Sequence, residues 1–301
     1  MSLRKEYRDS LKLAEVEEPL DLILYRPVAF LLAKVAARTP ITPNHITILS
    51  LLSGLAAAYV FAQWTPASLR WGGLLVAAAN IFDCADGQLA RMKKRGSSFG
   101  RLADGASDWT MGIAVFTALG LGLSRQMGAM PAWVLVCATG LSTGIHSGVF
   151  DFVQLEYLSA VRAQKLFLLG ELDRINAELS QPGLRAMNLT RHGGLLVYRS
   201  YLTAQQRLLL RSRKSTAIAP EDYRSANVRA MRWWTLLGSS TDRTLLIIAS
   251  LLGYPVVYCL LVAGPLNLYL GAMLYWKHRI DRRLQPSAGE SKGRNAMNAP
   301  T

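Results

Sequence analysis

Five long stretches of the chain carry no Lys, Arg, Asp or Glu, and these stretches restrict the possible fold more than any other feature. They are residues 43–69, 71–82, 109–124, 131–150 and 244–276. About 20 apolar residues in a helix are enough to cross the roughly 30 Å hydrocarbon core of a bilayer. A backbone in lipid must satisfy its own hydrogen bonds, so the segments are expected to be helical. The sequence predicts an all-α, polytopic integral membrane protein.

We expect six transmembrane helices in these stretches. Their approximate bounds are 43–62, 71–90, 105–124, 131–150, 244–262 and 264–280. Thr42 and Pro43 are typical of a helix start, with Thr as the N-cap and Pro in the first turn. The last uncharged stretch would be about 50 Å long as one helix, too long for a single crossing, and Gly264-Pro265 is the predicted division.

The basic residues predict the orientation of the chain. With these spans, the two loops on one side contain only Arg70 and Arg125 of the 34 Lys and Arg residues. By the positive-inside rule, both termini face the cytoplasm. We therefore interpret the net charge of +14 as a basic cytoplasmic face that attracts anionic lipid and nucleotide, and we expect no nucleic-acid partner. Cys84, Cys137 and Cys259 all lie in apolar segments and predict no disulfide framework.

The remaining regions divide the chain further. We expect a cytoplasmic lead at 1–42, spans 1–4 at 43–151, a helical cytoplasmic insertion at 152–242, spans 5 and 6 at 243–283, and a disordered tail at 284–301. Within the lead, residues 19–38 predict an amphipathic helix lying in the membrane interface. The insertion predicts helices over 155–179, 195–210 and 221–237, with breaks at 181–183, 193–194 and 219–220.

Four aspartates lie at the edges of the second and third apolar segments. The chain reads D-C-A-D-G-Q-L-A-R from residue 83 and G-R-L-A-D-G-A-S-D from residue 100. Helical spacing puts Asp83 and Asp86 on one face, and Asp104 and Asp108 on one face of the next helix. Clustered carboxylates repel one another unless they hold protons or cations, and oxygen ligands suit Mg²⁺, Mn²⁺ or Ca²⁺. The pattern predicts a metal site, interpreted as binuclear.

Small residues accompany these aspartates. Gly87, Ala90 and Gly100 keep bulk away from the carboxylates, as expected where a base or a diphosphate approaches the backbone closely. Arg91 offers a planar cation for phosphate oxygens. Metal ligands beside a phosphate-binding face predict phosphoryl-group chemistry.

The eight residues Asp83, Asp86, Gly87, Ala90, Arg91, Gly100, Asp104 and Asp108 follow the pattern D-x2-D-G-x2-A-R-x8-G-x3-D-x3-D. This pattern resembles that of the CDP-alcohol phosphotransferase family. The resemblance implies transfer of a phosphate-substituted alcohol from a CDP-alcohol, such as CDP-diacylglycerol, to the hydroxyl of an alcohol or lipid acceptor, with release of CMP. It also implies a role in phospholipid synthesis and a homodimer. We expect the enzyme in the cytoplasmic membrane of a bacterium or archaeon.

On this interpretation Asp83, Asp86, Asp104 and Asp108 hold two Mg²⁺ or Mn²⁺ ions. Asp108 is also the candidate base, and its role as base, ligand or both stays open. Alternatives are a CDP-inositol or CDP-amino-alcohol transferase, a cation channel or transporter, and a nucleotide-binding sensor that uses residues 152–242 as its output.

Four further polar residues have less specific interpretations. Asn80 contacts either a carboxylate or a neighbouring helix, and Lys93 contacts either phosphate or the membrane surface. His45 is expected to be interfacial and not a metal ligand, while His146 is expected to be a hydrogen-bonded core residue.

Overall fold

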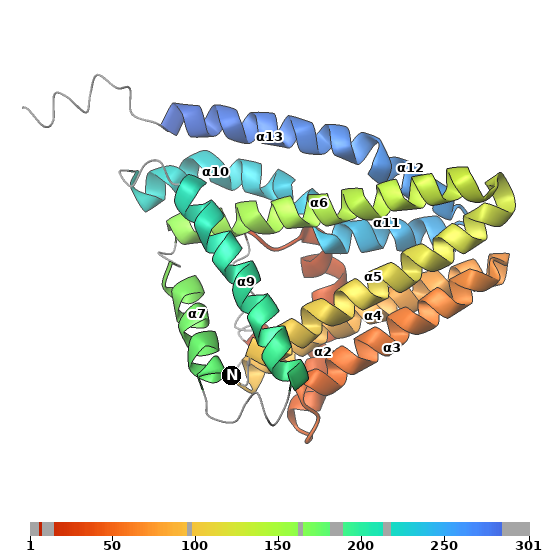
Figure 1. The fold of residues 1–301 in the computed structure, drawn as a ribbon, viewed down its shortest axis with the longest axis horizontal. Coiled ribbons are helices and arrows are strands. Elements are labelled where there is room, and N and C mark those ends of the chain that lie inside the picture. Colours follow the sequence, from red (N-terminus) through yellow and green to blue (C-terminus); the bar gives the residue numbers. More distant parts are fainter. Residues whose placement is uncertain are drawn as a thin grey trace, which may run out of the picture.

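The structure is a computed structural model, and it describes residues 6–7, 15–94, 98–161, 165–180, 189–212 and 218–284. Every regular element in these ranges is helical, which confirms the all-α prediction (Figure 1). The elements are η1 (Asp21–Tyr25), α2 (Arg26–Ala37), α3 (Pro43–Gln63), α4 (Pro66–Met92), α5 (Ser98–Met127), α6 (Ala129–Val161), α7 (Lys165–Leu179), α9 (Leu189–Ser212), α10 (Pro220–Trp234), η2 (Thr235–Leu237), α11 (Ser239–Leu251), α12 (Pro255–Ala263) and α13 (Pro265–Leu284). The predicted break at 181–183 and nearly all of the predicted tail lie outside the described residues.

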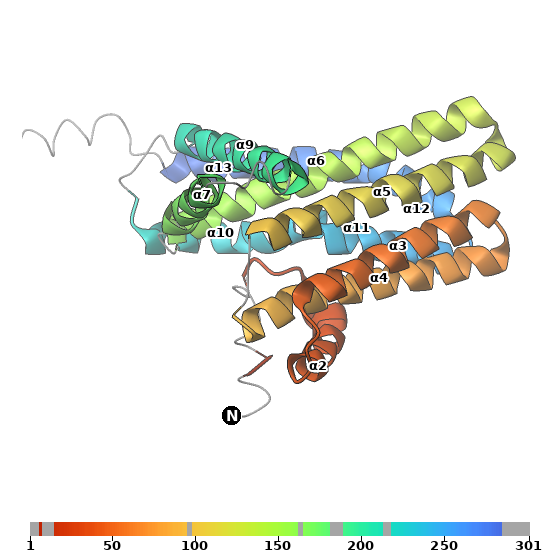
Figure 2. The same cartoon turned by 60° about the horizontal axis from the view of Figure 1, so that its bottom comes forward.

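The long helices form a bundle around a common apolar core. α3 packs against α4 and α5, α5 packs against α6, and α11 and α12 close the bundle against α4 and α6. Figure 2 shows these helices running along one shared direction. Phe61, Leu119 and Leu123 are fully buried in this core. Glycines allow close contact, since a Cβ on Gly54 would overlap Met111 and one on Gly72 would overlap Phe61.

Four helical segments have the length and apolar composition needed to cross a membrane. They are Pro43–Gln63, Gly100–Met127, Ala129–Val161 and Pro255–Leu284. α4 is 27 residues long, but Arg70 interrupts one end of it and the aspartates interrupt the other. α11 has only 13 residues. The described residues therefore contain a membrane-type bundle, and the six-span count stays a prediction.

The end of the chain differs from the predicted fifth and sixth spans. A span over 244–262 is not one helix, because α11 ends at Leu251 and the chain reverses before α12 begins at Pro255 (Figure 1). Gly253 makes the turn possible with φ of 83°, and the backbone N–H of Tyr254 donates to Ala249 at 2.8 Å. α12 and α13 then continue in one direction past Gly264, where we predicted the reversal.

The described parts of residues 152–242 are mostly helical, and their helix boundaries differ from the predicted ones. α6 runs eleven residues beyond the predicted end of the fourth span at residue 150, to Val161. α7 and α9 pair with each other and lean on α5, whereas α10 packs against α6 and α13. α10 begins at Pro220, as the predicted break requires. The predicted break at Gly193-Gly194 is wrong, since α9 continues through it and Gly194 lets α9 approach Leu102 of α5 closely.

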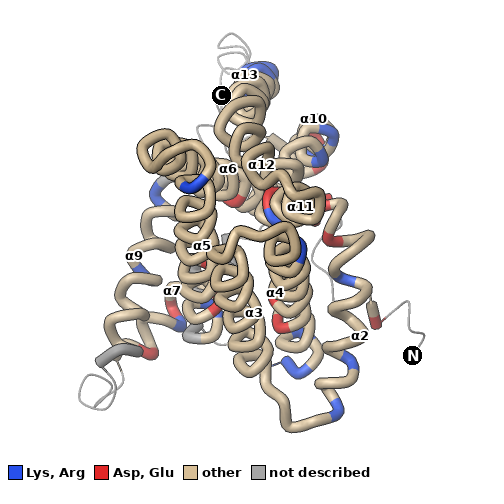
Figure 3. Tube along the Cα trace, turned by 90° about the vertical axis from the view of Figure 1, so that its right-hand side faces the viewer, with Lys and Arg blue, Asp and Glu red and all other residues tan. Residues whose placement is uncertain are grey.

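The predicted amphipathic helix corresponds to η1 and α2, which lie beside α4 on the opposite side of the bundle from α7 and α9 (Figure 3). Ala29 and Ala33 are fully buried in this contact. Large apolar side chains point the other way, with Ile23, Leu31 and Val35 between 61% and 79% exposed. This exposed apolar face has the composition expected of a helix that contacts lipid.

Candidate metal and nucleotide site

The structure brings three of the four predicted aspartates together. Asp83 and Asp86 lie near the end of α4, Asp104 lies in the second turn of α5, and both helices pack against α3. One carboxylate oxygen from each of the three lies within 4.8 Å of the others. Ligand oxygens on one divalent cation are separated by at most about twice the metal–oxygen distance of 2.0–2.6 Å. The three carboxylates therefore fit a single divalent cation.

Asp108 does not belong to this group of three carboxylates, and it is held by an arginine that we did not predict. The Arg243 guanidinium, from α11, donates through Nη2 to Asp108 Oδ1 at 2.8 Å. Through Nη1 it donates to Asp83 Oδ2 and to Asn80 Oδ1, each at 2.8 Å. Asn80 thus contacts the neighbouring helix, which was one of its two predicted roles. The available sequence signal for Arg243 was its position directly before a 33-residue uncharged stretch.

Asp86 is the most deeply buried member of the triad and has a fixed partner. Only 6% of its surface is exposed. Thr47, on α3, donates its hydroxyl to Asp86 Oδ2 at 2.6 Å. Hydrogen bonds of this kind orient a ligand before its cation binds. We did not predict this contact from the sequence.

Two of the small residues are half-buried beside the aspartates, Ala90 one turn after Asp86 and Gly100 one turn before Asp104. At Gly87, the nearest described atoms to an added Cβ are the Arg91 guanidinium nitrogens, at 3.6 and 3.8 Å. No neighbouring helix is close to that point in the described chain. Gly87 therefore differs from the packing glycines Gly54 and Gly72, and helix packing does not account for it.

The other polar candidates have ordinary structural partners. Lys93 donates to the backbone carbonyls of Thr39 at 2.8 Å and Ile41 at 2.6 Å, so it ties the end of α4 to the link between α2 and α3. His45 Nδ1 accepts from the backbone N–H of Thr42 at 3.3 Å. His146 is buried and hydrogen-bonded to Asn267 at 3.0 Å, which agrees with its predicted core role.

Comparison with known proteins bears directly on this arrangement of carboxylates. Residues 40–167 match the CDP-alcohol phosphatidyltransferase family, and the matched range contains all eight pattern residues and Thr47. The match covers less than half of the chain, and over residues 40–167 the chain is similar to that family. Arg243 and helices α9 to α13 lie outside the match. Our sequence-based resemblance to the family is confirmed for the first four long helices.

Curated relatives of this domain include two kinds of enzyme. A bifunctional IPC transferase and DIPP synthase from Aquifex aeolicus is 30% identical over 139 residues, covering 42% of this chain and 31% of the relative. A phosphatidylinositol phosphate synthase from Corynebacterium glutamicum is 31% identical over 132 residues, covering 44% of this chain and 56% of the relative. A second phosphatidylinositol phosphate synthase, from Mycobacteroides abscessus, is 33% identical over 88 residues, covering 29% of this chain and 39% of the relative. The matches span about half, or less, of these relatives.

Proposed function

We propose that the protein transfers a phosphate-substituted alcohol from a CDP-alcohol to an acceptor hydroxyl in phospholipid synthesis, releasing CMP. The observation that supports this most strongly is the convergence of Asp83, Asp86 and Asp104 within one cation's reach. The family match over the same residues adds the chemical class. A divalent cation, Mg²⁺ or Mn²⁺, would neutralise the diphosphate and make its phosphorus easier to attack.

The residues around the cation site have separate proposed roles. Gly87 and Ala90 leave space for the nucleotide beside α4, Gly100 does so at the start of α5, and Arg91 supplies a cation for the phosphates. The acceptor oxygen bonds to the phosphorus that carries the transferred group, while the bond from that phosphorus to CMP breaks.

Asp108 is the proposed base, which takes the proton from the acceptor hydroxyl. Its side chain is 41% exposed, against 24% for Asp83, so it is the more accessible of these two carboxylates to an acceptor. A second divalent cation would also need Asp108 as a ligand, and Asp108 Oδ1 accepts a hydrogen bond from Arg243 in this structure.

The acceptor and donor are proposed from the relatives' names. Phosphatidylinositol phosphate synthase indicates CDP-diacylglycerol with an inositol phosphate acceptor as the first pair to test. CDP-inositol and CDP-amino-alcohols are the alternative donors. Release of CMP would separate all of these reactions from cation transport and from nucleotide sensing.

We further propose that α3, α4, α5, α6, α11 and the α12–α13 pair are the six spans, with the aspartates on the cytoplasmic side. The turns at the far end contain no Lys or Arg, and Arg70 and Arg125 are the nearest basic residues. Cysteines introduced at positions 67 and 127 should react with an impermeant reagent outside the cell, and one at position 200 should not. Equal labelling at all three positions would contradict the orientation.

The proposed function is tested by CMP release from purified protein. We expect no turnover after chelation, and a loss of more than about 100-fold in Asp83→Asn, Asp86→Asn, Asp104→Asn and Asp108→Asn, since even partners of metal ligands typically contribute 10–100-fold. Raised Mg²⁺ or Mn²⁺ should partly restore Asp86→Asn and not Asp108→Asn, if Asp108 is the base. Full turnover after chelation would contradict the metal-dependent mechanism.

A further inference from the structure

Arg243 is the one described side chain of α11 that reaches the aspartate site. Its guanidinium bridges Asp83 of α4 and Asp108 of α5 through 2.8 Å contacts, and its side chain is 12% exposed. An arginine stays charged at any physiological pH. The site therefore contains a fixed positive charge that belongs to the protein.

This charge stands in conflict with the proposed divalent cation. Asp83 belongs both to the triad that fits a cation and to the ion pair with Arg243. Two positive charges that share one carboxylate repel each other, and the repulsion is strong where water is scarce. Binding of divalent cations should therefore require Arg243 to weaken or break its ion pair with Asp83 or Asp108.

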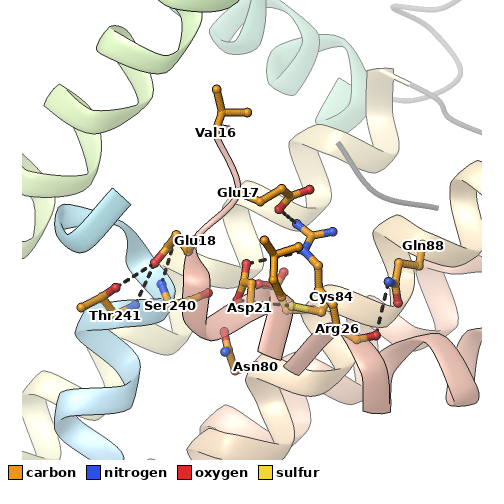
Figure 4. A network of polar contacts seen from close by, with 12 residues as sticks. Val16, Glu17, Glu18, Asp21, Arg26, Asn80, Cys84, Gln88, Ser240 and Thr241 are labelled. Atoms are coloured by element: carbon orange, nitrogen blue, oxygen red, sulfur yellow. Dashed lines mark hydrogen bonds and ion pairs between the residues drawn. The ribbon is translucent and has the colours of Figure 1, made fainter. Parts of the chain in front are cut away.

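The N-terminal segment fixes the helix that carries Arg243. Gly238, the N-cap of α11, has no side chain to cap the helix, and the Glu18 carboxylate takes that position instead (Figure 4). Glu18 accepts from the backbone N–H groups of Ser240 at 3.3 Å and Thr241 at 2.9 Å. A Cβ on Gly238 would overlap Glu18, so the glycine permits this approach. Glu18 thus caps α11 from 220 residues earlier in the chain.

The residues on either side of Arg243 hold α11 in one rotational position. Asp242 accepts from the hydroxyls of Thr143 on α6, at 3.1 Å, and Tyr258 on α12, at 3.0 Å. Thr244 shares a 2.8 Å hydrogen bond with Tyr25 of η1. These anchors direct Arg243 toward the aspartates.

We propose that Arg243 is an internal counter-cation of the aspartate site and that Glu18 is a positioning residue which holds it there through α11. Binding of divalent cations is thereby opposed by α11, and this opposition depends on the N-terminal segment. The inference rests on the proposed cation site, and it adds two residues outside the family match to that site.

The test is Mn²⁺ binding to the purified full-length protein without nucleotide, measured from the electron paramagnetic resonance signal of free Mn²⁺. Arg243→Met should bind Mn²⁺ at least about fivefold more tightly than wild type, because one positive charge is removed. Arg243→Lys keeps the charge and should stay within about twofold of wild type. A purely structural role for Arg243 would weaken binding in both variants.

Glu18 is tested in the same assay. Glu18→Gln should tighten Mn²⁺ binding by a smaller factor than Arg243→Met, and it should add nothing in the double variant, since Glu18 acts through Arg243. The matched control is Glu17→Gln, which removes the neighbouring buried carboxylate. Glu17 pairs with Arg26 of α2 at 2.6 Å, whereas Glu18 caps α11, so the Glu17 variant should bind Mn²⁺ as wild type does.

Each outcome decides one point. Unchanged or weaker binding in folded Arg243→Met overturns the counter-cation, and a Glu18→Gln effect that persists in the double variant overturns the positioning role. If Arg243→Met does not fold, Arg243→Gln replaces it, and Glu18→Gln must still tighten binding. If the wild type binds no Mn²⁺, or if Asp86→Asn does not change its binding, the proposed cation site itself is contradicted. That outcome differs from the two that overturn the counter-cation or the positioning role.

Discussion

The hydroxyl of Thr47 holds the carboxylate of Asp86, which we propose as a metal ligand. Thr47→Val keeps the shape and removes the hydrogen bond to Asp86. We expect Mn²⁺ affinity to fall about 10–100-fold, the usual cost of losing such a partner. Ser50→Ala is the control, because Ser50 lies one turn further along α3 and donates to the backbone carbonyl of Ala79, not to a ligand. Equal losses in the two variants would mean that α3 packing is responsible.

Gly87 tests whether the space beside α4 belongs to the nucleotide. Gly87→Leu should abolish binding of a CDP-alcohol while the protein still folds, because only the Arg91 guanidinium lies near the added carbon among described residues. Gly54→Leu is the contrasting variant, and it should lower the unfolding temperature because its side chain would overlap Met111. Normal CDP-alcohol binding by Gly87→Leu would show that the space has another purpose.

Residue spacing was sufficient to predict which side chains meet, but only within neighbouring helices. The offsets of Asp83, Asp86 and Asp104 follow directly from helical periodicity. Arg243 arrives from a helix more than a hundred residues later, and no local spacing encodes that contact. The ion pair of Asp108 with Arg243 could not be predicted in this way, and the role of Asp108 as a metal ligand stays a prediction.

At the scale of the elements, Glu18 makes the junction of the N-terminal segment and α11 sensitive to pH. Burial, and then the nearby Asp21, raises the pKa of Glu18 from 4.5 to about 7, although hydrogen bonds from Thr241 and Ser240 act in the opposite direction. The folded protein therefore keeps a proton that the unfolded chain releases. The stability from this proton is complete below about pH 4.5 and is lost as the pH rises through about 7.

The prediction is a pH-dependent difference between wild type and Glu18→Gln. The pKa shift of Glu18 corresponds to a contribution on the order of 3 kcal/mol to the free energy of unfolding. Between pH 4.5 and 8, the unfolding temperature of the wild type should fall relative to that of Glu18→Gln, as measured by thermal unfolding in detergent. A constant difference across this range would contradict the assignment.

Helix starts were easier to predict than helix ends. Pro43 and Pro220 begin helices as expected, because proline fits the first turn. The reversal after α11 was missed although Gly253 and Pro255 are an ordinary stop and start signal, because the apolar stretch around them has no charge to mark a boundary. Gly193-Gly194 predicts a helix break, but α9 continues through it, and Gly194 instead permits close contact between α9 and α5.

At the scale of the whole molecule, the insertion is not one unit. α10 contributes the buried Trp234 and Met231 to a core shared with α6 and α13. α7 and α9 instead contact α5 close to the aspartates. Removal of the entire insertion would therefore damage the bundle, whereas removal of α7 and α9 would not.

We predict that replacing residues 162–217 with a Gly/Ser linker leaves CDP-alcohol affinity unchanged and alters the Michaelis constant for the acceptor or the oligomeric state. The first quantity is measured by equilibrium binding, and the others by steady-state kinetics and light scattering. The full replacement of residues 158–236 is the control, and it should lower the unfolding temperature. Loss of CDP-alcohol binding in the shorter replacement, if it still folds, would mean that α7 and α9 build the nucleotide site.

The long separation between Arg243 and Asp108 also has a consequence for how the protein is made. The two residues are 135 positions apart, and ribosomes add roughly 5–20 residues per second. For roughly 7 to 27 seconds, the newly inserted α4 and α5 must hold their carboxylates without their permanent counter-charge. During that interval the growing chain has to keep this edge of the helices in water or occupied by cations from the solvent. The order of synthesis thus favours a site that meets metal first and its own arginine afterwards.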